Sequence, residues 1–159
     1  MAADAKRKRS DREVSRSSAR LGAVQALYQM DIAGTDLSEV LAQFGAGRMG
    51  ETFDDGECGV ADFDFLKDIV EGVVREQHGI DRAVEDHLAA AWTLGRLDST
   101  LRAVLRAGAY ELMFRSDVPA RVTITEYVDV AHAFFEAEEP RVVNGVLDAL
   151  ARAHRAGEF

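Results

Sequence analysis

The stretch LRAVLRAGAYELMFRSDVPARVTITEYVDVAHAFFEAEEPRVVNGVLDALAR, residues 101–152, decides the fold of this chain because it predicts three consecutive helices. Four apolar residues and one glycine recur at steps of three and four in the first helix: Leu101, Val104, Leu105, Gly108 and Leu112. This spacing places them on one face, where Gly108 would allow another backbone to come close. Proline pushes the residue before it out of helical conformation, so we expect this helix to end before Val118-Pro119.

The next two helices are predicted from the residues at their starts. Thr123 and Glu126 have the T-x-x-E spacing of a capping box, and the flanking Val122 and Tyr127 have the spacing of a hydrophobic staple. We therefore expect the second helix to start near Thr123. Pro140 suits the first position of the third helix because its φ is fixed and it has no N–H to satisfy. The apolar stripe of this third helix consists of Val143, Val146, Leu147 and Leu150.

Helical periodicity also covers most of the chain before residue 101. Ser10 and Glu13 have capping-box spacing at the start of the first helix, and Asp36 and Asp98 are candidate N-caps of later ones. The pair His78-Gly79 is expected to end the third helix. The expected inward residues, helix by helix, are Leu21, Val24, Leu27 and Tyr28; Leu37, Val40, Leu41 and Phe44; Phe65, Leu66, Ile69, Val70 and Val73; and Ile80, Val84, Leu88 and Trp92.

No alternating segment long enough for a strand interrupts these patterns, so the predicted fold is all-α. About seven helices would form two packed subbundles of three and four helices, at about residues 16–78 and 80–155. Residues 45–60 hold five glycines and several carboxylates, a composition that favours a mobile surface loop. The 159 residues are one domain's worth of chain, and the single cysteine excludes an internal disulfide.

Charge is distributed unevenly along the chain. Residues 1–20 carry seven Lys or Arg against three acidic residues, so they hold +4 of a formal net charge of −9 and leave −13 on the remainder. Residues 1–15 are expected to be a basic flexible arm ahead of one helical domain at 16–159. A basic segment on an acidic protein would steer it toward polyanions such as nucleic acids, although charge runs are most often simply solvated.

Motifs for other chemistries are weak. The sequence Gly45-Ala46-Gly47-Arg48-Met49-Gly50 matches G-x-G-x-x-G, but it follows a helix and precedes carboxylates, which does not suit a dinucleotide. Asp129 and His132 are one pair where a di-metal bundle needs two. Carboxylates around Cys58 would suppress its thiolate. We therefore expect no enzyme, metal or cofactor, and the lack of a long apolar run predicts a cytoplasmic protein without a membrane span.

Four strings in the chain resemble the NusB family of transcription antitermination factors: AVQALYQMD, LRAVLRAGAYEL, RSDVPARVTITEYVDVA and RVVNGVLD. The resemblance runs from about Arg16 to about Arg152. It implies the same two-subbundle fold and a non-enzymatic factor that binds boxA RNA of ribosomal RNA operons. The implied protein partners are small-subunit ribosomal protein ten, known as NusE, and the RNA polymerase antitermination complex.

The resemblance also implies which residues bind. The family holds RNA with an arginine-rich start to its first helix, with a ring that matches Phe134 and with a basic residue that matches Arg141. Here Ser17 and Ser18 replace common arginines, and Val142 replaces a common aromatic residue. The expected RNA-binding residues are Arg7, Lys8, Arg9, Arg12, Arg16, Arg20, Phe134, Arg141 and Asn144. The expected protein-binding residues are Arg96, Leu101, Arg102 and Leu105.

Alternatives remain open from the sequence. Phe134 and Phe135 could both seal the gap between two helices, in which case neither ring would stack on a base. The same helical fold serves as the RNA-guiding domain of a ribosomal RNA methyltransferase. It could also act as a protein adaptor or homodimer without RNA, in which case the basic arm would be incidental.

Overall fold

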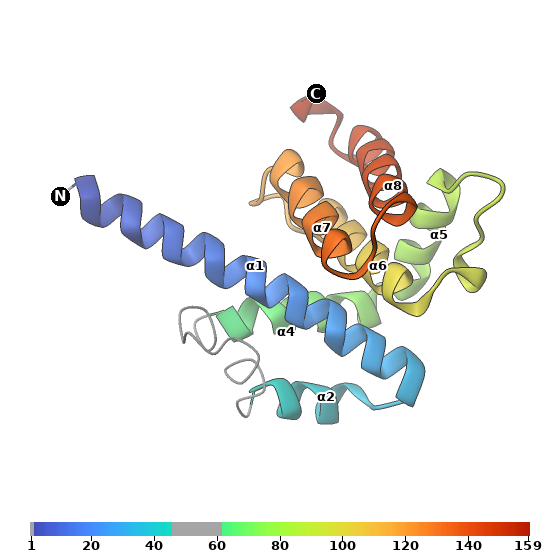
Figure 1. Cartoon of the computed structure of the whole chain (residues 1–159), viewed down its shortest axis with the longest axis horizontal. Helices are drawn as coiled ribbons and strands as arrows, with labels where there is room; N and C mark the ends of the chain where they lie inside the picture. Colours follow the sequence, from blue (N-terminus) through green and yellow to red (C-terminus); the bar gives the residue numbers. More distant parts are fainter. Residues whose placement is uncertain (1, 46–61) are drawn as a thin grey trace. The chain divides into compact units, whose positions relative to one another are not determined.

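The computed structural model describes residues 2–45 and 62–159, with side chains described from Ser15 onward. These residues form seven α-helices and two short 3-10 helices and contain no strand, which confirms the all-α fold (Figure 1). The elements are α1 (Ala2–Ala33), α2 (Leu37–Gln43), α4 (Phe63–Arg75), α5 (Gln77–His87), η3 (Leu94–Arg96), α6 (Ser99–Phe114), α7 (Ala120–Phe134), α8 (Glu138–His154) and η4 (Ala156–Glu158). The predicted loop at 45–60 lies, except for Gly45, outside the described residues.

The chain divides into two compact units, Met1–Val70 and Glu71–Phe159. This boundary lies inside α4, earlier than the boundary expected between the subbundles. The first helix also begins at Ala2 and not at Ser10, so residues 2–15 continue α1 without a break. The division into a basic arm at 1–15 and one domain at 16–159 stays a prediction.

In the first unit, α1 and α2 are joined by a tight turn at Gly34, whose φ of +68° favours glycine. Asp36 caps α2 as predicted, because its carboxylate accepts a 2.8 Å hydrogen bond from the Glu39 N–H. The Gln29 side chain on α1 donates to the Gln43 side chain on α2 at 2.8 Å. The turn and the amide pair together fix the register of the two helices.

The inward face of α1 differs from the prediction at Tyr28, and Leu21 on the predicted face is only half-buried. Val24 and Leu27 are buried, but Tyr28 is 41% exposed. The buried face is completed by Ala19, Ala23 and Ala26, whose small side chains gave no strong apolar signal. Tyr28 is one residue past Leu27 and is therefore rotated about 100° away from this face.

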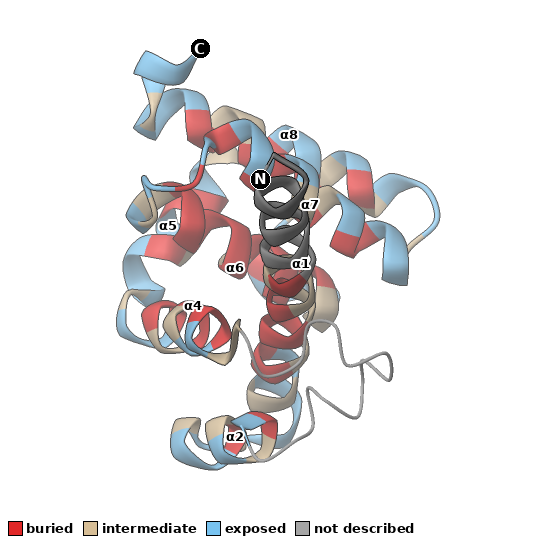
Figure 2. Ribbon diagram, turned by 90° about the vertical axis from the view of Figure 1, so that its left-hand side faces the viewer, coloured by how far each residue is buried: buried red, intermediate tan, exposed pale blue. Residues whose placement is uncertain are grey.

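The second unit is built on α6, which packs against α5, α7 and α8. Figure 2 shows most of α6 as buried. The predicted stripe is confirmed, since Leu101, Val104, Leu105 and Leu112 are at most 1% exposed. Asp98 caps the helix as expected, through a 2.8 Å hydrogen bond from the Thr100 N–H.

Polar contacts hold the helices of this unit in place. The Tyr127 hydroxyl on α7 donates to the buried Glu111 carboxylate on α6 at 2.5 Å. Arg106 on α6 makes a bidentate pair with Asp81 on α5, at 2.8 and 3.0 Å. A buried carboxylate without such a partner would be strongly destabilising, so the Tyr127 hydroxyl fixes α7 against α6.

The capping box predicted at Thr123 is wrong. The helix α7 begins at Ala120 after Pro119, and the Thr123 N–H already donates to the Pro119 carbonyl inside the helix, at 3.1 Å. The Thr123 side chain is buried and its hydroxyl has no hydrogen-bond partner among the described residues. The predicted staple fails as well, because Val122 is 45% exposed.

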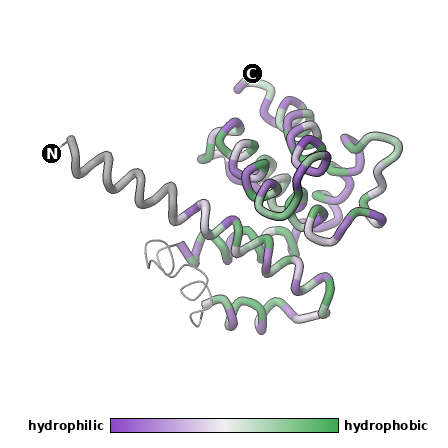
Figure 3. Tube along the Cα trace, in the orientation of Figure 1, coloured by the Kyte–Doolittle hydropathy of each residue, from purple (hydrophilic) through white to green (hydrophobic). Residues whose placement is uncertain are grey.

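Other helix ends are also shifted. The pair His78-Gly79 lies inside α5, and the chain turns at Glu76 between α4 and α5. Trp92 lies beyond the end of α5, so it does not belong to that helix. Pro140 is the third residue of α8 and not the first. Figure 3 shows hydrophilic and hydrophobic residues alternating along α7 and α8, as expected of helices with one buried face.

The close approach predicted at Gly108 generates the first testable prediction. A Cβ built at Gly108 would lie 2.7 Å from the Leu147 Cδ1 of α8 and 3.4 Å from the Tyr127 ring of α7. We expect Gly108→Val to lower the free energy of unfolding by about 1–3 kcal/mol, because Leu147 must move and the added methyl groups have no free space beside the Tyr127 ring. The measurement is chemical denaturation.

The matched control is Gly79→Val on α5, where nothing lies within 4 Å of an added Cβ. Its unfolding free energy should change little. Equal stability of the two variants would contradict the packing described at Gly108.

Candidate nucleic-acid interface

The predicted RNA-binding residues near the start of the chain all lie on α1. Arg7, Lys8, Arg9 and Arg12 are helical, and their side chains are outside the described residues. A helical backbone spaces residues three and four apart on one face, so Arg9 and Arg12 share a face with Arg16. The basic run therefore continues along the helix that carries the next two predicted residues.

Arg16 and Arg20 lie over one aromatic ring. Their guanidinium carbons are 4.7 and 5.0 Å from the centroid of Phe65 on α4. Arg16 is half-buried, and its Nε has no hydrogen-bond partner among the described atoms. Arg20 is only 2% exposed. This burial does not fit a direct phosphate contact by Arg20, and a stacking role within the first unit explains the residue better.

Phe65 was expected only as a core residue. Local patterns did not predict its contact with two arginines, because that contact joins helices more than forty residues apart in the chain. Both cations lie within 5.0 Å of the centroid of one ring, an arrangement that holds Arg16 in place although the residue is only half-buried.

Phe134 is the last residue of α7 and is 44% exposed. Its neighbour Phe135 caps the helix and is half-buried. A ring that seals two helices would lose nearly all its exposure, so Phe134 suits a stacking surface better than a seal. Phe135 is the better candidate for the sealing role.

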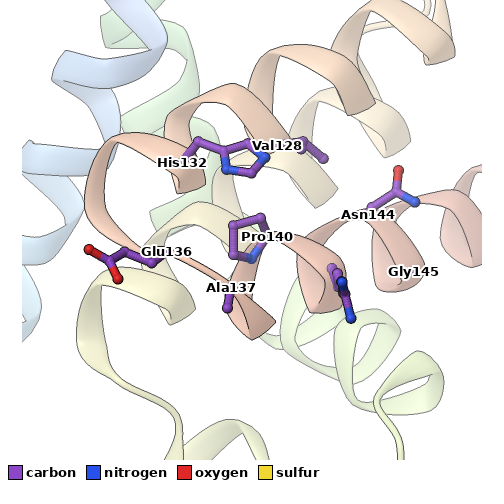
Figure 4. A pocket seen from close by; sticks show the side chains of 8 residues that line it. Val128, His132, Glu136, Ala137, Pro140, Asn144 and Gly145 are labelled. Atoms are coloured by element: carbon purple, nitrogen blue, oxygen red, sulfur yellow. The ribbon is translucent and has the colours of Figure 1, made fainter.

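Arg141 and Asn144 line an open hollow of about 540 Å³ between α7 and α8. Figure 4 shows Val128 and His132 of α7 on one side and Asn144 and Gly145 of α8 on the other. Both predicted residues are exposed. The hollow combines a cation, a side-chain amide and open space beside Gly145, so it offers hydrogen-bond donors to a ligand.

The predicted RNA-binding residues thus belong to different units. Arg16 and Arg20 are in the first unit, and Phe134, Arg141 and Asn144 are in the second. Within the second unit the structure brings Arg141 and Asn144 together in one hollow.

Two of the four predicted protein-binding residues are buried. Leu101 and Leu105 are at most 1% exposed in the core of the second unit, so their side chains offer little surface to a partner, and their role as partner contacts stays a prediction. They are buried because both lie on the apolar stripe of α6, which packs inside the unit. Arg102 is half-buried and donates to the carbonyls of Leu94 and Leu97 at 3.2 and 3.3 Å. Arg96, on η3, is exposed.

A set of contacts that the sequence did not predict joins residues 155–159 to the start of α7. Arg155 donates to the Val118 carbonyl at 2.7 Å, and the Glu158 carboxylate accepts from the Ala120 N–H at 2.9 Å. Arg155 and Glu158 also form an ion pair. Because Pro119 has no side-chain acceptor, Glu158 supplies the cap that α7 lacks locally.

Neither a metal site nor a membrane-spanning helix is found in the described part of the chain. No three His, Cys, Asp or Glu side chains gather there as a metal site would require. None of the helices described is both long and apolar enough to cross a membrane.

Comparison with known proteins places the chain in a family. The family model described as the NusB family matches residues 17–152. The transcription antitermination protein NusB of Nitrobacter hamburgensis is 53% identical over 144 residues, which cover 91% of this chain and 90% of that protein. Sequence and fold therefore point to the class of bacterial transcription antitermination proteins.

Solved structures of NusB proteins are also similar to this chain. NusB of T. maritima superposes with a TM-score of 0.71 at 28% identity, covering 87% of this chain and 92% of that one. A crystal structure of the antitermination factors NusB and NusE in complex with dsRNA gives a TM-score of 0.69 at 30% identity, covering 87% and 97%. The chain belongs to the NusB family.

The contacts of Glu158 predict a pH-dependent stability. The hydrogen bond from the Ala120 N–H, with further help from Arg155, lowers the pKa of Glu158 below its ordinary value, although desolvation partly opposes this. A lowered pKa means that the stabilisation is present above the ordinary carboxylate pKa and is lost as pH falls through the folded-state pKa. We expect Glu158→Gln to lower the melting temperature at pH 7, with the difference from the parent shrinking as pH falls below the ordinary carboxylate pKa and through the lowered folded-state pKa.

Glu85→Gln is the matched control, because Glu85 is exposed on α5. Its melting temperature should follow that of the parent at every pH. A Glu158→Gln variant with the parent's stability at pH 7 would show that the carboxylate does not cap α7.

Proposed function

We propose that this chain is a non-enzymatic, cytoplasmic transcription antitermination factor that binds boxA RNA of ribosomal RNA operons together with NusE. The observation that carries this proposal is the family match over residues 17–152, together with a relative named as a transcription antitermination protein at 53% identity. The solved complex of NusB and NusE with dsRNA supports both partners. In this role the bound RNA and NusE would keep RNA polymerase processive as part of an antitermination complex.

The described residues support different roles for different parts of the proposed RNA surface. The basic start of α1 would hold phosphates, because arginines on a helix face pair with phosphate oxygens. Phe134 would stack on a base, and Arg141 and Asn144 would contact the RNA from the hollow between α7 and α8. The alternative of a helical adaptor without RNA gains no support from the exposed Phe134, which a purely structural role leaves unexplained.

We expect the protein partner to strengthen RNA binding, which would be weak for this chain alone. Val142 replaces an aromatic residue that is common in the family, so one stacking surface is absent. Binding of NusE would raise the effective concentration of the RNA at the remaining contacts, without any new contact on this chain. Arg96 is the remaining exposed candidate for the NusE contact.

The basic arm provides the experiment that tests this function. A variant with Lys6, Arg7, Lys8 and Arg9 changed to glutamine removes four cations and leaves the arginines that stack on Phe65. Each phosphate contact contributes about 0.7 to the slope of log K against log[salt] for single strands, so losing three contacts should flatten the slope by about two units. The measurement is fluorescence anisotropy with a boxA RNA, with and without NusE.

The control changes two exposed arginines on other helices, Arg75→Gln and Arg82→Gln, and should keep the parent's slope. Affinity for NusE alone should be unchanged in both variants. If the arm variant binds boxA RNA with the parent's affinity and slope, the arm is only solvated. If the parent itself does not bind boxA RNA even with NusE, the proposed function is wrong.

Phe134 provides a separate test of the proposed RNA surface. Phe134→Ala should weaken boxA RNA binding by about 1–3 kcal/mol, the usual contribution of one base stacked on an aromatic ring. Its melting temperature should stay close to the parent's, because the ring is 44% exposed. Phe134→Tyr should retain most of the affinity. Unfolding of the alanine variant would instead assign the ring a sealing role.

A further inference from the structure

A second hollow lies on the same pair of helices as the first. It has a volume of about 280 Å³ and is lined by α7 and α8 residues and by Phe159. Asn144 lines both hollows, so they are neighbours along one groove between α7 and α8. The first hollow holds Arg141, and the second holds Arg121 and Arg152.

The second hollow carries an aromatic ring that lies near two cations. The guanidinium carbons of Arg152 and Arg121 are 4.7 and 5.9 Å from the centroid of the Phe159 ring. The residue Phe159 is nevertheless 38% exposed, so the arginines do not cover it completely. A partly exposed aromatic residue near arginines is the combination that binds a base by stacking and its phosphate by charge.

The chain holds this ring in position from both sides. The contacts of Arg155 and Glu158 with the start of α7 fix the segment that carries Phe159. Arg152 is itself oriented by a 2.9 Å hydrogen bond from its Nε to Asp148, which also lines the hollow. Stacking on a ring loses less entropy when the ring is already ordered, so this arrangement favours binding.

The charged residues that line the groove are more favourable for a polyanion than the acidic remainder of the chain is. Its cations are Arg121, Arg141 and Arg152, and its carboxylates are Glu136 and Asp148. Asp148 is paired with Arg152. Counted on side chains alone, the lining carries one more positive than negative charge, on a chain whose formal net charge is −9.

We propose that Arg121, Arg152 and Phe159 form a second subsite for single-stranded RNA, reached from the Arg141 hollow past Asn144. This inference rests on the proposed function and extends it, because it gives the RNA a path beyond the residues that the family resemblance implies. Nucleotides flanking the boxA element would occupy the subsite. One base would stack on Phe159, and the neighbouring phosphates would face the two arginines.

The test compares three RNA probes on the full-length protein in the presence of NusE. One probe is the boxA element alone, and the other two carry about six additional nucleotides at the 5′ or the 3′ end, a length within the usual range of single-strand sites. We expect one of the extended probes to bind at least about fivefold more tightly than the short one, the low end for one stacked base.

Variants of this chain test whether the extra affinity of the extended probe comes from the second subsite. Phe159→Ala and Arg121→Gln should each reduce or abolish the gain and leave the affinity for the short probe unchanged. Phe159→Tyr should preserve the gain, since its ring can still stack. Arg82→Gln on α5 removes one exposed cation outside the groove and should also preserve it. Arg121→Gln keeps the test decisive if Phe159→Ala proves unstable, because Arg121 is exposed and contacts the ring from outside.

The outcomes separate the two proposals. If the short probe binds but neither extension adds affinity, the second subsite does not exist and the proposed function stands. A gain that persists in both Phe159→Ala and Arg121→Gln would place the flanking nucleotides elsewhere and overturn the inference. Equal loss of short and extended probes in these variants would overturn it as well. If the short probe does not bind, both proposals fail.

Discussion

The close approach of α7 and α8 to α6 at Gly108 is the constraint on which the second unit depends. Leu147 occupies the space that a side chain at this position would need, and the ring of Tyr127 lies beside it. The same Tyr127 places its hydroxyl on the buried Glu111 carboxylate. Steric fit and a buried hydrogen bond thus act on the same helices. The groove that carries Arg141 and Asn144 lies between α7 and α8, so its shape follows from this packing.

Some arginines in this protein have structural roles, and others belong to the proposed RNA surface. Arg20 is buried on the Phe65 ring, and Arg102 donates to carbonyls that connect η3 with α6. Arg121 and Arg141 are exposed and line the α7–α8 groove. A guanidinium can fill either role because it is planar, always charged and weakly hydrated. Burial distinguishes the two roles, and formal charge does not.

The segment that follows α8 connects stability with the candidate interface. Glu158 satisfies the N–H of Ala120 at the start of α7, where Pro119 offers no side-chain acceptor. The same contacts hold Phe159 against Arg121 and Arg152. Loss of the cap would therefore both weaken the start of α7 and release the ring from the groove.

The sequence by itself determined the all-α fold, the stripe of α6 and the N-caps at Asp36 and Asp98, because periodicity and capping act within a few residues. Its family motifs also determined the class of protein. Only the tertiary structure decided that Thr123 is buried inside α7, that Arg20 stacks on Phe65 and that Glu158 caps α7. Each of these depends on a contact with a distant part of the chain or on burial, which local patterns do not record.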